Sequence, residues 1–242
     1  MTGGSDDLLA QLAASSDEAG LFLDFDGVLA PIVERPEDAV APPATRHELE
    51  RLVAEYALVA VVSGRAGDDV RARVGVDGVV CVGSHGLELE PQADRWRRIL
   101  AAFAADAPWP PEEIEVKGLA VAFHFRGHPD EQEAVRVLDR VADSARDEGL
   151  VARYGRKVLE VLPPVSSHKG TAVRHLIDEH GLRRGLAAGD DTTDIDSFAA
   201  LEGLETAVRV AVTSDESPQL LIEAADVVVG STGEFLEILG RL

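Results

Sequence analysis

The sequence predicts an α/β protein whose core is a doubly wound, Rossmann-like parallel sheet interrupted by an inserted α+β domain. Short apolar runs that do not alternate with polar residues are separated by helix-like segments near both ends of the chain. Such runs are typical of parallel strands that helices cover on both faces. Between them the pattern changes to proline breaks and alternating strands. We therefore expect a core of residues 1–90 and 164–242, with an inserted cap domain at 91–163.

The first part of the predicted core alternates between strand and helix. An apolar strand at residues 21–24 precedes a helix that a capping box of Thr45 and Glu48 would open. One face of this helix is apolar and carries Leu49, Leu52, Val53 and Tyr56. The apolar runs at 58–62 and 79–82 are the next two strands, with a second helix between them. Strands separated by helices in this way favour parallel pairing.

The last part of the chain repeats this pattern. A helix at residues 171–180 ends at Gly181, because glycine readily adopts the left-handed conformation that closes a helix. The strand that follows at 186–188 is weak by propensity, and its position between helices is what predicts it. Two further apolar runs, at 208–212 and 227–229, and a C-terminal helix complete the core.

The inserted segment contains a helix, two strands, a second helix and two more strands. The predicted helices are 95–105 and 130–148, the second with Glu133 in its cap and Gly149 at its end, and the predicted strands are 114–116, 119–126, 151–154 and 158–162. The strand at 119–126 places Val121, Phe123 and Phe125 on one face, as expected for a sheet with one buried side. This order predicts a small antiparallel layer backed by helices.

Charge and composition narrow the classes of function. The 242 residues include 44 acidic and 23 basic side chains, and the net charge of −21 disfavours binding to nucleic acid or to an anionic membrane. Cys81 is the one cysteine, so no internal disulfide forms, as is typical of a reducing compartment. The apolar runs are shorter than a membrane span, and the acidic N-terminus does not resemble a signal peptide. We expect a soluble, cytoplasmic protein without a nucleic-acid or membrane partner.

The first predicted strand ends in two carboxylates, Asp24 and Asp26, and is followed by Gly27. Residues at i and i+2 of a strand share a face, so both acids would point the same way from the carboxyl end, where parallel sheets bind their ligands. Two close carboxylates repel each other unless a divalent cation neutralises them or one of them keeps a proton. The pair therefore outlines a phosphoryl-transfer site, with a strand running into an acidic turn as the alternative.

Three further segments lie at strand ends or helix starts of the predicted core. They are Ser63-Gly64-Arg65, His168-Lys169-Gly170 and the acidic loop from Gly189 to Asp194. A parallel sheet would gather such segments at one edge. There, Asp24 would attack phosphorus as the nucleophile, and Asp26 would act first as an acid and then as a base. Lys169 and the Ser63 hydroxyl would hold the phosphate oxygens.

The acidic loop supplies the predicted metal ligands. Asp190 would bind Mg²⁺ together with Asp24, because an all-oxygen shell suits that hard cation. Asp191 and Asp194 would be alternative ligands or would support the ligands. Capping of the next helix by Asp191 or Thr192 is a second interpretation of the same loop, and it is compatible with metal binding.

These four segments occur in the order found in the haloacid dehalogenase superfamily of aspartyl-phosphate phosphatases, which the sequence resembles over nearly all of its length. The resemblance implies that the backbone carbonyl of Asp26 also binds the metal. A receiver-type signalling module would likewise use aspartates, Mg²⁺ and a lysine, but the acid pair on the first strand and the inserted cap argue against it. A non-catalytic sugar-phosphate-binding protein is disfavoured because the chain retains every core motif residue.

Within the superfamily, the cap and its motifs most resemble those of the trehalose-6-phosphate phosphatases. The matching pieces are Ser63-Gly64-Arg65, Gly83-Ser84-His85-Gly86, Glu115-Val116-Lys117, His124-Phe125-Arg126 and residues 155–160. The resemblance implies that the substrate is bound by Arg65, His85, Gly86, Lys117, His124, Arg126, Lys157 and Glu160. The carboxylate would accept hydrogen bonds from sugar hydroxyls and the cations would donate them. Solvated strand positions are the alternative for the three cap cations, and simple packing is the alternative for the two histidines.

We therefore expect a Mg²⁺-dependent hydrolase that converts trehalose 6-phosphate to trehalose and phosphate through an aspartyl phosphate. Its partner would be a small sugar phosphate, and the protein would be a monomer. The chain has Leu162 where the family usually carries arginine, and His168 where an acid is common. These positions leave an alternative open, namely a phosphatase for another glycosyl phosphate of the mannosylglycerate, sucrose or aminocyclitol (pseudo-disaccharide) type.

Overall fold

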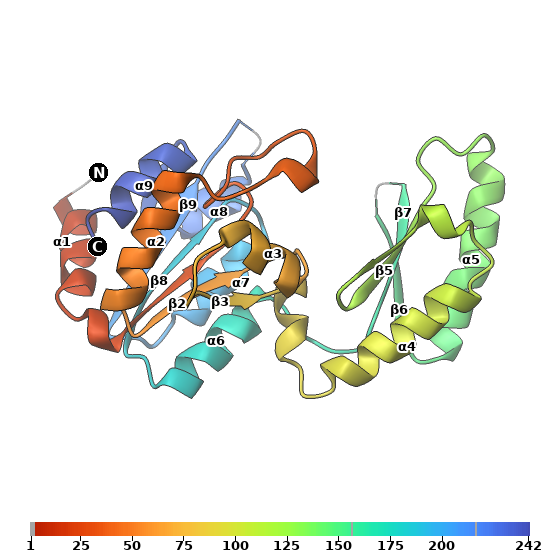
Figure 1. Ribbon diagram of the computed structural model, residues 1–242, viewed down its shortest axis with the longest axis horizontal. Helices are drawn as coiled ribbons and strands as arrows, with labels where there is room; N and C mark the ends of the chain where they lie inside the picture. Colours follow the sequence, from red (N-terminus) through yellow and green to blue (C-terminus); the bar gives the residue numbers. More distant parts are fainter. Residues whose placement is uncertain (1–2, 156, 216) are drawn as a thin grey trace. The chain divides into compact units, whose positions relative to one another are not determined.

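The structure is a computed structural model that describes residues 3–155, 157–215 and 217–242 (Figure 1). Arg156, which belongs to the predicted motif at 155–160, therefore lies outside the described residues. The chain forms two compact units. The core unit comprises the residues up to Gly86 together with Ser167–Leu242, and the inserted unit is Leu87–Ser166. Each unit has an apolar core of its own.

The core unit contains a six-stranded parallel sheet with the strand order β10-β9-β8-β1-β2-β3. Its strands are β1 (Ala19–Leu23), β2 (Leu58–Val62), β3 (Val80–Val82), β8 (Arg184–Gly189), β9 (Thr206–Val212) and β10 (Val227–Val229). The chain adds strands outward from β1 to β3, then returns beside β1 and adds β8 to β10 on the other side. Open α/β sheets bind ligands at the carboxyl ends of the strands where the winding reverses, which is here between β1 and β8. The predicted doubly wound core is confirmed.

Helices cover both faces of this sheet. They are α1 (Gly3–Ala13), α2 (Pro43–Glu55), α3 (Gly67–Val74), α6 (Lys169–His180), α7 (Asp194–Ala200), α8 (Gln219–Ala224) and α9 (Thr232–Leu239). Leu9 of α1, Leu49 of α2 and Phe235 of α9 join Leu21 and Leu23 of β1 in one apolar cluster. Helices α6 and α7 lie against the opposite face (Figure 1). This two-sided cover explains why β1 and β2 are buried along their whole length.

Helix α2 begins earlier than the sequence pattern predicts. Its first residue is Pro43, the preceding Pro42 is extended, and no side chain caps the helix. Thr45 lies inside the first turn and is buried, so the predicted capping box of Thr45 and Glu48 is wrong. Proline at a helix start has a suitable φ and lacks an N–H that would need a partner, so it replaces the cap. The pattern also does not predict α1 or the six-residue α8.

The inserted unit contains a four-stranded antiparallel sheet with the order β4-β5-β7-β6. Its strands are β4 (Ile114–Lys117), β5 (Ala120–His124), β6 (Val151–Gly155) and β7 (Val158–Leu162), and its helices are α4 (Ala93–Asp106) and α5 (Glu131–Asp147). Phe103 of α4 and Leu138 of α5 pack with Phe123 of β5 on one face. Asp130 caps α5 by accepting hydrogen bonds from two backbone N–H groups, while the Glu133 side chain pairs with an arginine on the next turn. The predicted α+β insertion is confirmed.

Short 3₁₀ segments join these elements in the described residues: η1 (Ser16–Glu18), η2 (Pro36–Asp38), η4 (Pro111–Glu113) and η3 (Ser84–Leu89), which a kink at His85 and Gly86 interrupts. Cys81 on β3 is buried, and burial raises the pKa of its thiol. Among the described residues, none of the helices is at once long and apolar enough to cross a membrane.

A candidate active site at the carboxyl edge of the core sheet

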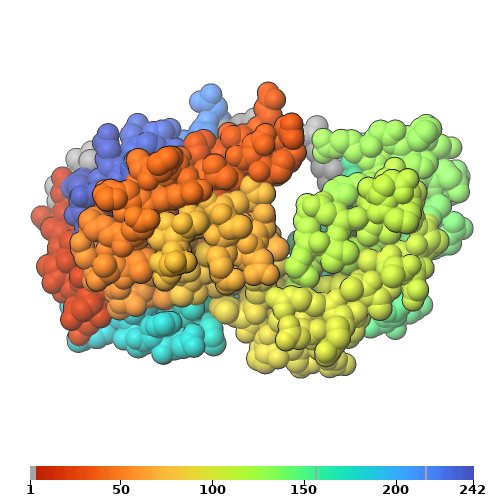
Figure 2. Space-filling view, in the orientation of Figure 1, coloured from red at the N-terminus to blue at the C-terminus, as the bar shows by residue number. Residues whose placement is uncertain are grey.

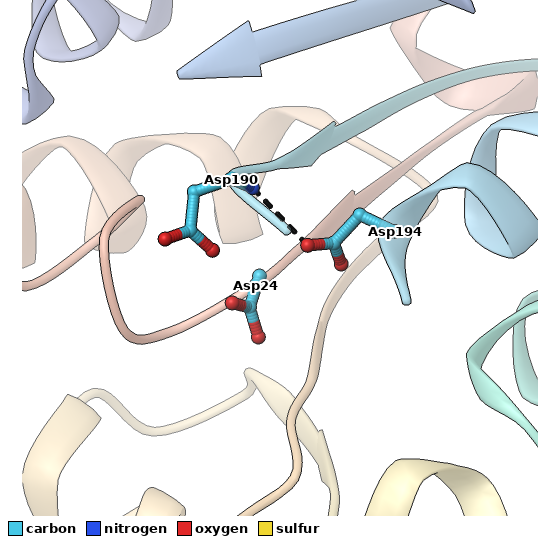
Figure 3. A group of neighbouring side chains, drawn as sticks. All are labelled: Asp24, Asp190 and Asp194. Atoms are coloured by element: carbon cyan, nitrogen blue, oxygen red, sulfur yellow. Dashed lines mark hydrogen bonds between the residues drawn. The ribbon is translucent and has the colours of Figure 1, made fainter. Parts of the chain in front are cut away.

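Two acids emerge at the point where the winding of the core sheet reverses. Asp24 directly follows β1 and Asp190 directly follows β8, and the Asp24 N–H donates to the carbonyl of Ala188, 3.0 Å away. Asp194 is the first residue of α7 and turns its side chain back toward both acids (Figure 3). Oxygens of these three carboxylates lie within 4.8 Å of one another. The fold therefore gathers residues from two separate segments of the sequence at one edge.

Lys169, the first residue of α6, connects two of these carboxylates. Its Nζ donates to Oδ1 of Asp24 at 2.8 Å and to Oδ1 of Asp194 at 2.7 Å, and the lysine side chain is 3% exposed. The other oxygen of Asp194 accepts a hydrogen bond from the backbone N–H of Asp190 at 3.1 Å (Figure 3). It accepts a second one from the backbone N–H of Asp191, also at 3.1 Å. Asp194 thus uses both oxygens to hold Lys169 and the acidic loop in place.

The ionisation of this cluster reflects its burial. Burial raises the pKa of Asp24 to about 7; Lys169 opposes this shift and Asp194 adds to it. Burial, together with Asp194, raises the pKa of Asp190 to about 6. Burial alone would lower the pKa of Lys169, but the carboxylates of Asp24 and Asp194 outweigh that effect and raise it. Three carboxylates therefore face one ammonium, and protonation near neutral pH relieves their mutual repulsion.

The donor set fits a divalent cation. All three candidate ligands are carboxylates, and a hard cation such as Mg²⁺ prefers oxygen. When ionised, the three acids carry two more negative charges than Lys169 offsets, which equals the charge of such an ion. Asp24 and Asp190 are the best-placed ligands, because Asp194 already has partners for both oxygens. Among the described residues, the cluster does not include Asp26 or Asp191.

Gly27 shapes the wall of this cluster. It has a φ of +77°, which side chains rarely tolerate, and a Cβ at this position would lie 2.2 Å from Oδ2 of Asp190. The turn after β1 therefore needs glycine both for its backbone and for the room that Asp190 occupies. Sequence reasoning placed Gly27 only as the end of the strand, and its contact with Asp190 depends on the pairing of β1 with β8.

Asp26 lies beside the carboxylate cluster and is held by Arg65. Nε and Nη2 of Arg65 donate to the two carboxylate oxygens of Asp26, both at 2.7 Å. Arg65 also donates to Asp69, and its guanidinium lies 5.6 Å from the centre of the Phe25 ring. The residue predicted to bind substrate thus contacts the predicted acid and base.

The remaining core residues of the prediction lie at the ends of β2 and β3. Ser63 is buried, its Oγ accepts a hydrogen bond from the backbone N–H of Arg65, and its carbonyl accepts one from that of His85. His85 and Gly86 both have positive φ, 53° and 98°, and the His85 ring packs where Gly64 leaves room for it. Gly64 therefore makes room for the His85 ring, and Gly86 provides the left-handed backbone that follows His85.

The acidic loop does not cap α7 in the predicted way. The helix starts at Asp194, the preceding Thr193 is already helical, and no side chain caps it. The Asp191 carboxylate accepts a hydrogen bond from the neighbouring Thr192 N–H and is exposed. The interpretation of Asp191 or Thr192 as the helix cap is therefore wrong. Instead, the side chain of Asp194, inside the helix, accepts hydrogen bonds from the backbone N–H groups of the loop.

The predicted substrate residues of the inserted unit lie on or beside its antiparallel sheet. One oxygen of Glu115 accepts from Nζ of Lys117 at 2.8 Å and contacts Nε2 of His124 at 2.9 Å. Glu160 pairs with Arg153 on the neighbouring strand, with Nε and the carboxylate oxygen 3.1 Å apart. These contacts place Lys117 and Glu160 in ion pairs and His124 in a hydrogen bond on one face of the sheet.

Two further predicted cations of this unit lie near its turns. Lys157 has a φ of +65°, pairs with Glu131 and lies 6.0 Å from the centre of the Phe125 ring. Arg126 follows β5 by two residues and is exposed. A lysine in the left-handed region marks a position where the surroundings outweigh the backbone preference.

Comparison with known proteins gives a consistent family signal. A family model described as trehalose-phosphatase matches residues 22–224. A trehalose-phosphate phosphatase of Mycobacterium avium is 34% identical over 223 residues, which cover 84% of this chain and 55% of that protein. A Mycobacterium tuberculosis protein described as an uncharacterized glycosyl hydrolase is 35% identical over 81% of this chain and 16% of its own length. The chain therefore spans less than two thirds of the length of these relatives.

Solved structures share the fold. A trehalose-6-phosphate phosphatase of Aspergillus fumigatus aligns with a TM-score of 0.67 at 20% identity and covers 97% of this chain and 96% of that chain. A haloacid dehalogenase-like hydrolase of Bacteroides thetaiotaomicron aligns with a TM-score of 0.62 at 14% identity, over 93% of this chain and 99% of that chain. At such identities the likeness is one of architecture alone.

Proposed function

Because the chain belongs to the trehalose-phosphatase family of the haloacid dehalogenase superfamily, we propose that it hydrolyses a sugar phosphate through an aspartyl phosphate on Asp24. The observation that carries this proposal is the buried contact between Asp24 and Lys169 beside Asp190 and Asp194. A carboxylate at the mouth of a parallel sheet, next to a fixed cation and further oxygen ligands, suits in-line attack on phosphorus.

The reaction would proceed in two steps at Asp24. An oxygen of Asp24 forms a bond to phosphorus while the bond from phosphorus to the sugar oxygen breaks. The departing sugar oxygen takes a proton from Asp26. Water then attacks phosphorus, Asp26 accepts the proton, and the bond to Asp24 breaks. Phosphate leaves, and both acids return to their starting states.

Lys169 and Ser63 would bind the phosphate oxygens during both steps. The Lys169 ammonium is fixed by Asp24 and Asp194, so it offers a directed positive charge rather than a mobile one. The buried Ser63 hydroxyl would add a neutral hydrogen-bond donor from the end of β2.

We propose Mg²⁺ as the cation, held by Asp24 and Asp190 and, as the resemblance to the superfamily implies, by the backbone carbonyl of Asp26. When bound, this cation supplies positive charge that offsets the charge of the phosphoryl oxygens. Asp194 would keep Asp190 and Lys169 oriented.

For the substrate we propose trehalose 6-phosphate, with Lys117, His124, Arg126, Lys157 and Glu160 of the inserted unit as sugar or phosphate contacts. Ion pairs such as Glu115 with Lys117 keep these side chains oriented, as recognition of a polyol requires. Arg65, His85 and Gly86 are the proposed contacts from the core unit. In the described structure Arg65 binds both carboxylate oxygens of Asp26.

The test is phosphate release with Mg²⁺ from a panel of esters: trehalose 6-phosphate, glucose 6-phosphate, sucrose 6-phosphate and mannosylglycerate phosphate. Preference for the trehalose ester supports the proposal in full. Preference for another ester retains the phosphatase and contradicts the sugar. Release from none of them, with no effect of EDTA, contradicts the proposed function.

We expect one fixed Mg²⁺ concentration, about tenfold above its Kd at pH 8, to raise the melting temperature by about 3 to 5 °C at pH 8 and by less at pH 6. Burial raises the pKa of Asp24 to about 7, so between its unfolded value of 3.8 and about 7 the folded protein binds more protons than the unfolded chain. Stability of the metal-free protein therefore falls as the pH rises through this window, and Mg²⁺ meets least competition from protons above it.

The measurement is thermal unfolding with EDTA and with Mg²⁺ at both pH values. Asp190→Asn is the matched variant: it should lose the response to Mg²⁺. In EDTA at pH 8 it should be at least as stable as the wild type, because it removes a buried negative charge. Equal responses to Mg²⁺ at the two pH values would contradict this account.

A further inference from the structure

A chain of charged side chains leads from Asp26 to helix α3. Arg65 uses Nε and Nη2 to hold both oxygens of Asp26, and its Nη1 donates to Oδ2 of Asp69 at 3.2 Å. Asp69 lies in the first turn of α3 and is four residues from both Arg65 and Arg73. Its other oxygen accepts a hydrogen bond from Nε of Arg73 at 2.7 Å. Asp69 therefore joins two arginines with one carboxylate.

The same arginines hold the loop between β1 and α2. Arg73 donates from Nη1 to the carbonyls of Glu37 and Ala39, both at 2.8 Å, and Arg65 donates from Nη2 to the carbonyl of Pro36 at 2.9 Å. In the ribbon and space-filling views, this red-orange loop lies beside the amber helix α3 (Figures 1 and 2). Both ends of the segment from Asp26 to Ala39 are thus fastened to α3 or to the residues just before it.

The two arginines of the network are well enclosed for charged side chains. The side chains of Arg65 and Arg73 are 14% and 15% exposed, and that of Asp69 is 40% exposed. The hydrogen bond from Arg73, with further help from Arg65, lowers the pKa of Asp69, so it remains a carboxylate at neutral pH. A long arginine side chain loses much rotamer freedom when it is held in one position, and contacts at both edges of the guanidinium supply that restraint.

We propose that Asp69 is a positioning residue for Asp26: it fixes the guanidinium of Arg65, which in turn fixes the carboxylate of Asp26. This proposal rests on the proposed function, because it assumes that Asp26 protonates the leaving oxygen. Without Asp69, Arg65 loses the hydrogen bond at Nη1 that helps to fix its guanidinium. The Asp26 carboxylate can then rotate away from the direction of proton transfer. Asp69 itself touches neither the substrate nor the carboxylate cluster in this role.

Leaving-group dependence separates this role from a purely structural one. Phenyl phosphate releases a basic phenolate that needs a proton, whereas dinitrophenyl phosphate releases an anion that does not. For each ester kcat/KM reports the steps up to release of the alcohol, so it excludes the later attack of water. A variant that misplaces Asp26 should lower kcat/KM for the phenyl ester and spare the dinitrophenyl ester. A variant that damages the fold or phosphate binding lowers both in parallel.

The experiment compares kcat/KM for the two esters, with Mg²⁺, in the wild type, Asp69→Asn and Asp68→Asn. Asp68 is the matched control, because it precedes Asp69, is 98% exposed and pairs with Arg71 on the helix surface. We expect Asp69→Asn to lower the phenyl-to-dinitrophenyl ratio by at least about tenfold, and Asp68→Asn to leave it unchanged. If Asp69→Asn does not fold, Arg73→Lys replaces it and is judged by the same ratio.

Two results would overturn the role of Asp69: a parallel loss with both esters, or a ratio in Asp69→Asn equal to that of Asp68→Asn. Failure of the proposed function is a separate result. In that case the wild type would release phosphate from neither aryl ester nor trehalose 6-phosphate, with or without Mg²⁺.

Discussion

Asp24→Asn is expected to lower phosphate release by about 10⁴-fold or more, because an amide cannot attack phosphorus as a carboxylate does. The substitution preserves the shape of the side chain, so Lys169 keeps its contact with Asp194 and the edge of the sheet stays intact. In EDTA at pH 8 the variant should be at least as stable as the wild type. Burial raises the pKa of Asp24, and its charge therefore opposes folding above pH 7.

The measurement combines phosphate release with thermal unfolding in EDTA. Asp68→Asn again serves as the control, since this exposed residue pairs with Arg71 and its substitution should change neither quantity. An Asp24→Asn variant that keeps a substantial share of the Mg²⁺-dependent activity would show that another group is the nucleophile. A large loss of stability would show instead that the Asp24 charge supports the fold.

Gly27→Ala is the second change with a large expected effect. The new Cβ would fall 2.2 Å from Oδ2 of Asp190, so this carboxylate has to leave its position beside Asp24. We expect activity to fall by at least about 100-fold, because misplacing a ligand by about 1 Å is enough for such a loss. The stabilisation by Mg²⁺ should disappear as well. The left-handed φ adds a cost of about 1 kcal/mol to the free energy of folding.

Gly203→Ala separates the steric effect from the backbone effect. Gly203 also has a positive φ, +89°, but no heavy atom lies within 4 Å of the Cβ that alanine would add. This variant should lose about 1 kcal/mol of stability and retain full activity and the response to Mg²⁺. Equal activity of the two variants would contradict the claim that Gly27 makes room for Asp190.

The substrate assay matters most for the inserted unit. The core would contribute the proposed reactive groups. The proposed sugar contacts of the inserted unit lie on or beside its antiparallel sheet, where Glu115 already pairs with Lys117 and His124. A sugar hydroxyl that displaces one of these partners still meets an oriented acceptor. This arrangement fits recognition of a polyol, and the ester panel decides which one.

The sequence alone was sufficient for the architecture and for the main acids of the site. The predicted strands at 58–62, 158–162 and 227–229 match β2, β7 and β10 residue for residue. A short segment rich in apolar β-branched residues and leucine has few other structures open to it. The same logic placed Asp24 and Asp190 at strand ends, and the structure brings both together with Asp194 and Lys169. Their catalytic roles remain predictions.

Only the tertiary structure decided which side chains meet. Arg65 pairs with Asp26 across 39 positions of sequence, and Gly27 faces Asp190 because β1 and β8 are neighbours in the sheet. The link from Asp69 to Asp26 likewise requires a known direction for α3. Periodicity and spacing report the face of an element on which a residue lies, but partners far apart in sequence depend on strand order and packing. That is the physical reason why the acids were predictable and the contacts that hold them in place were not.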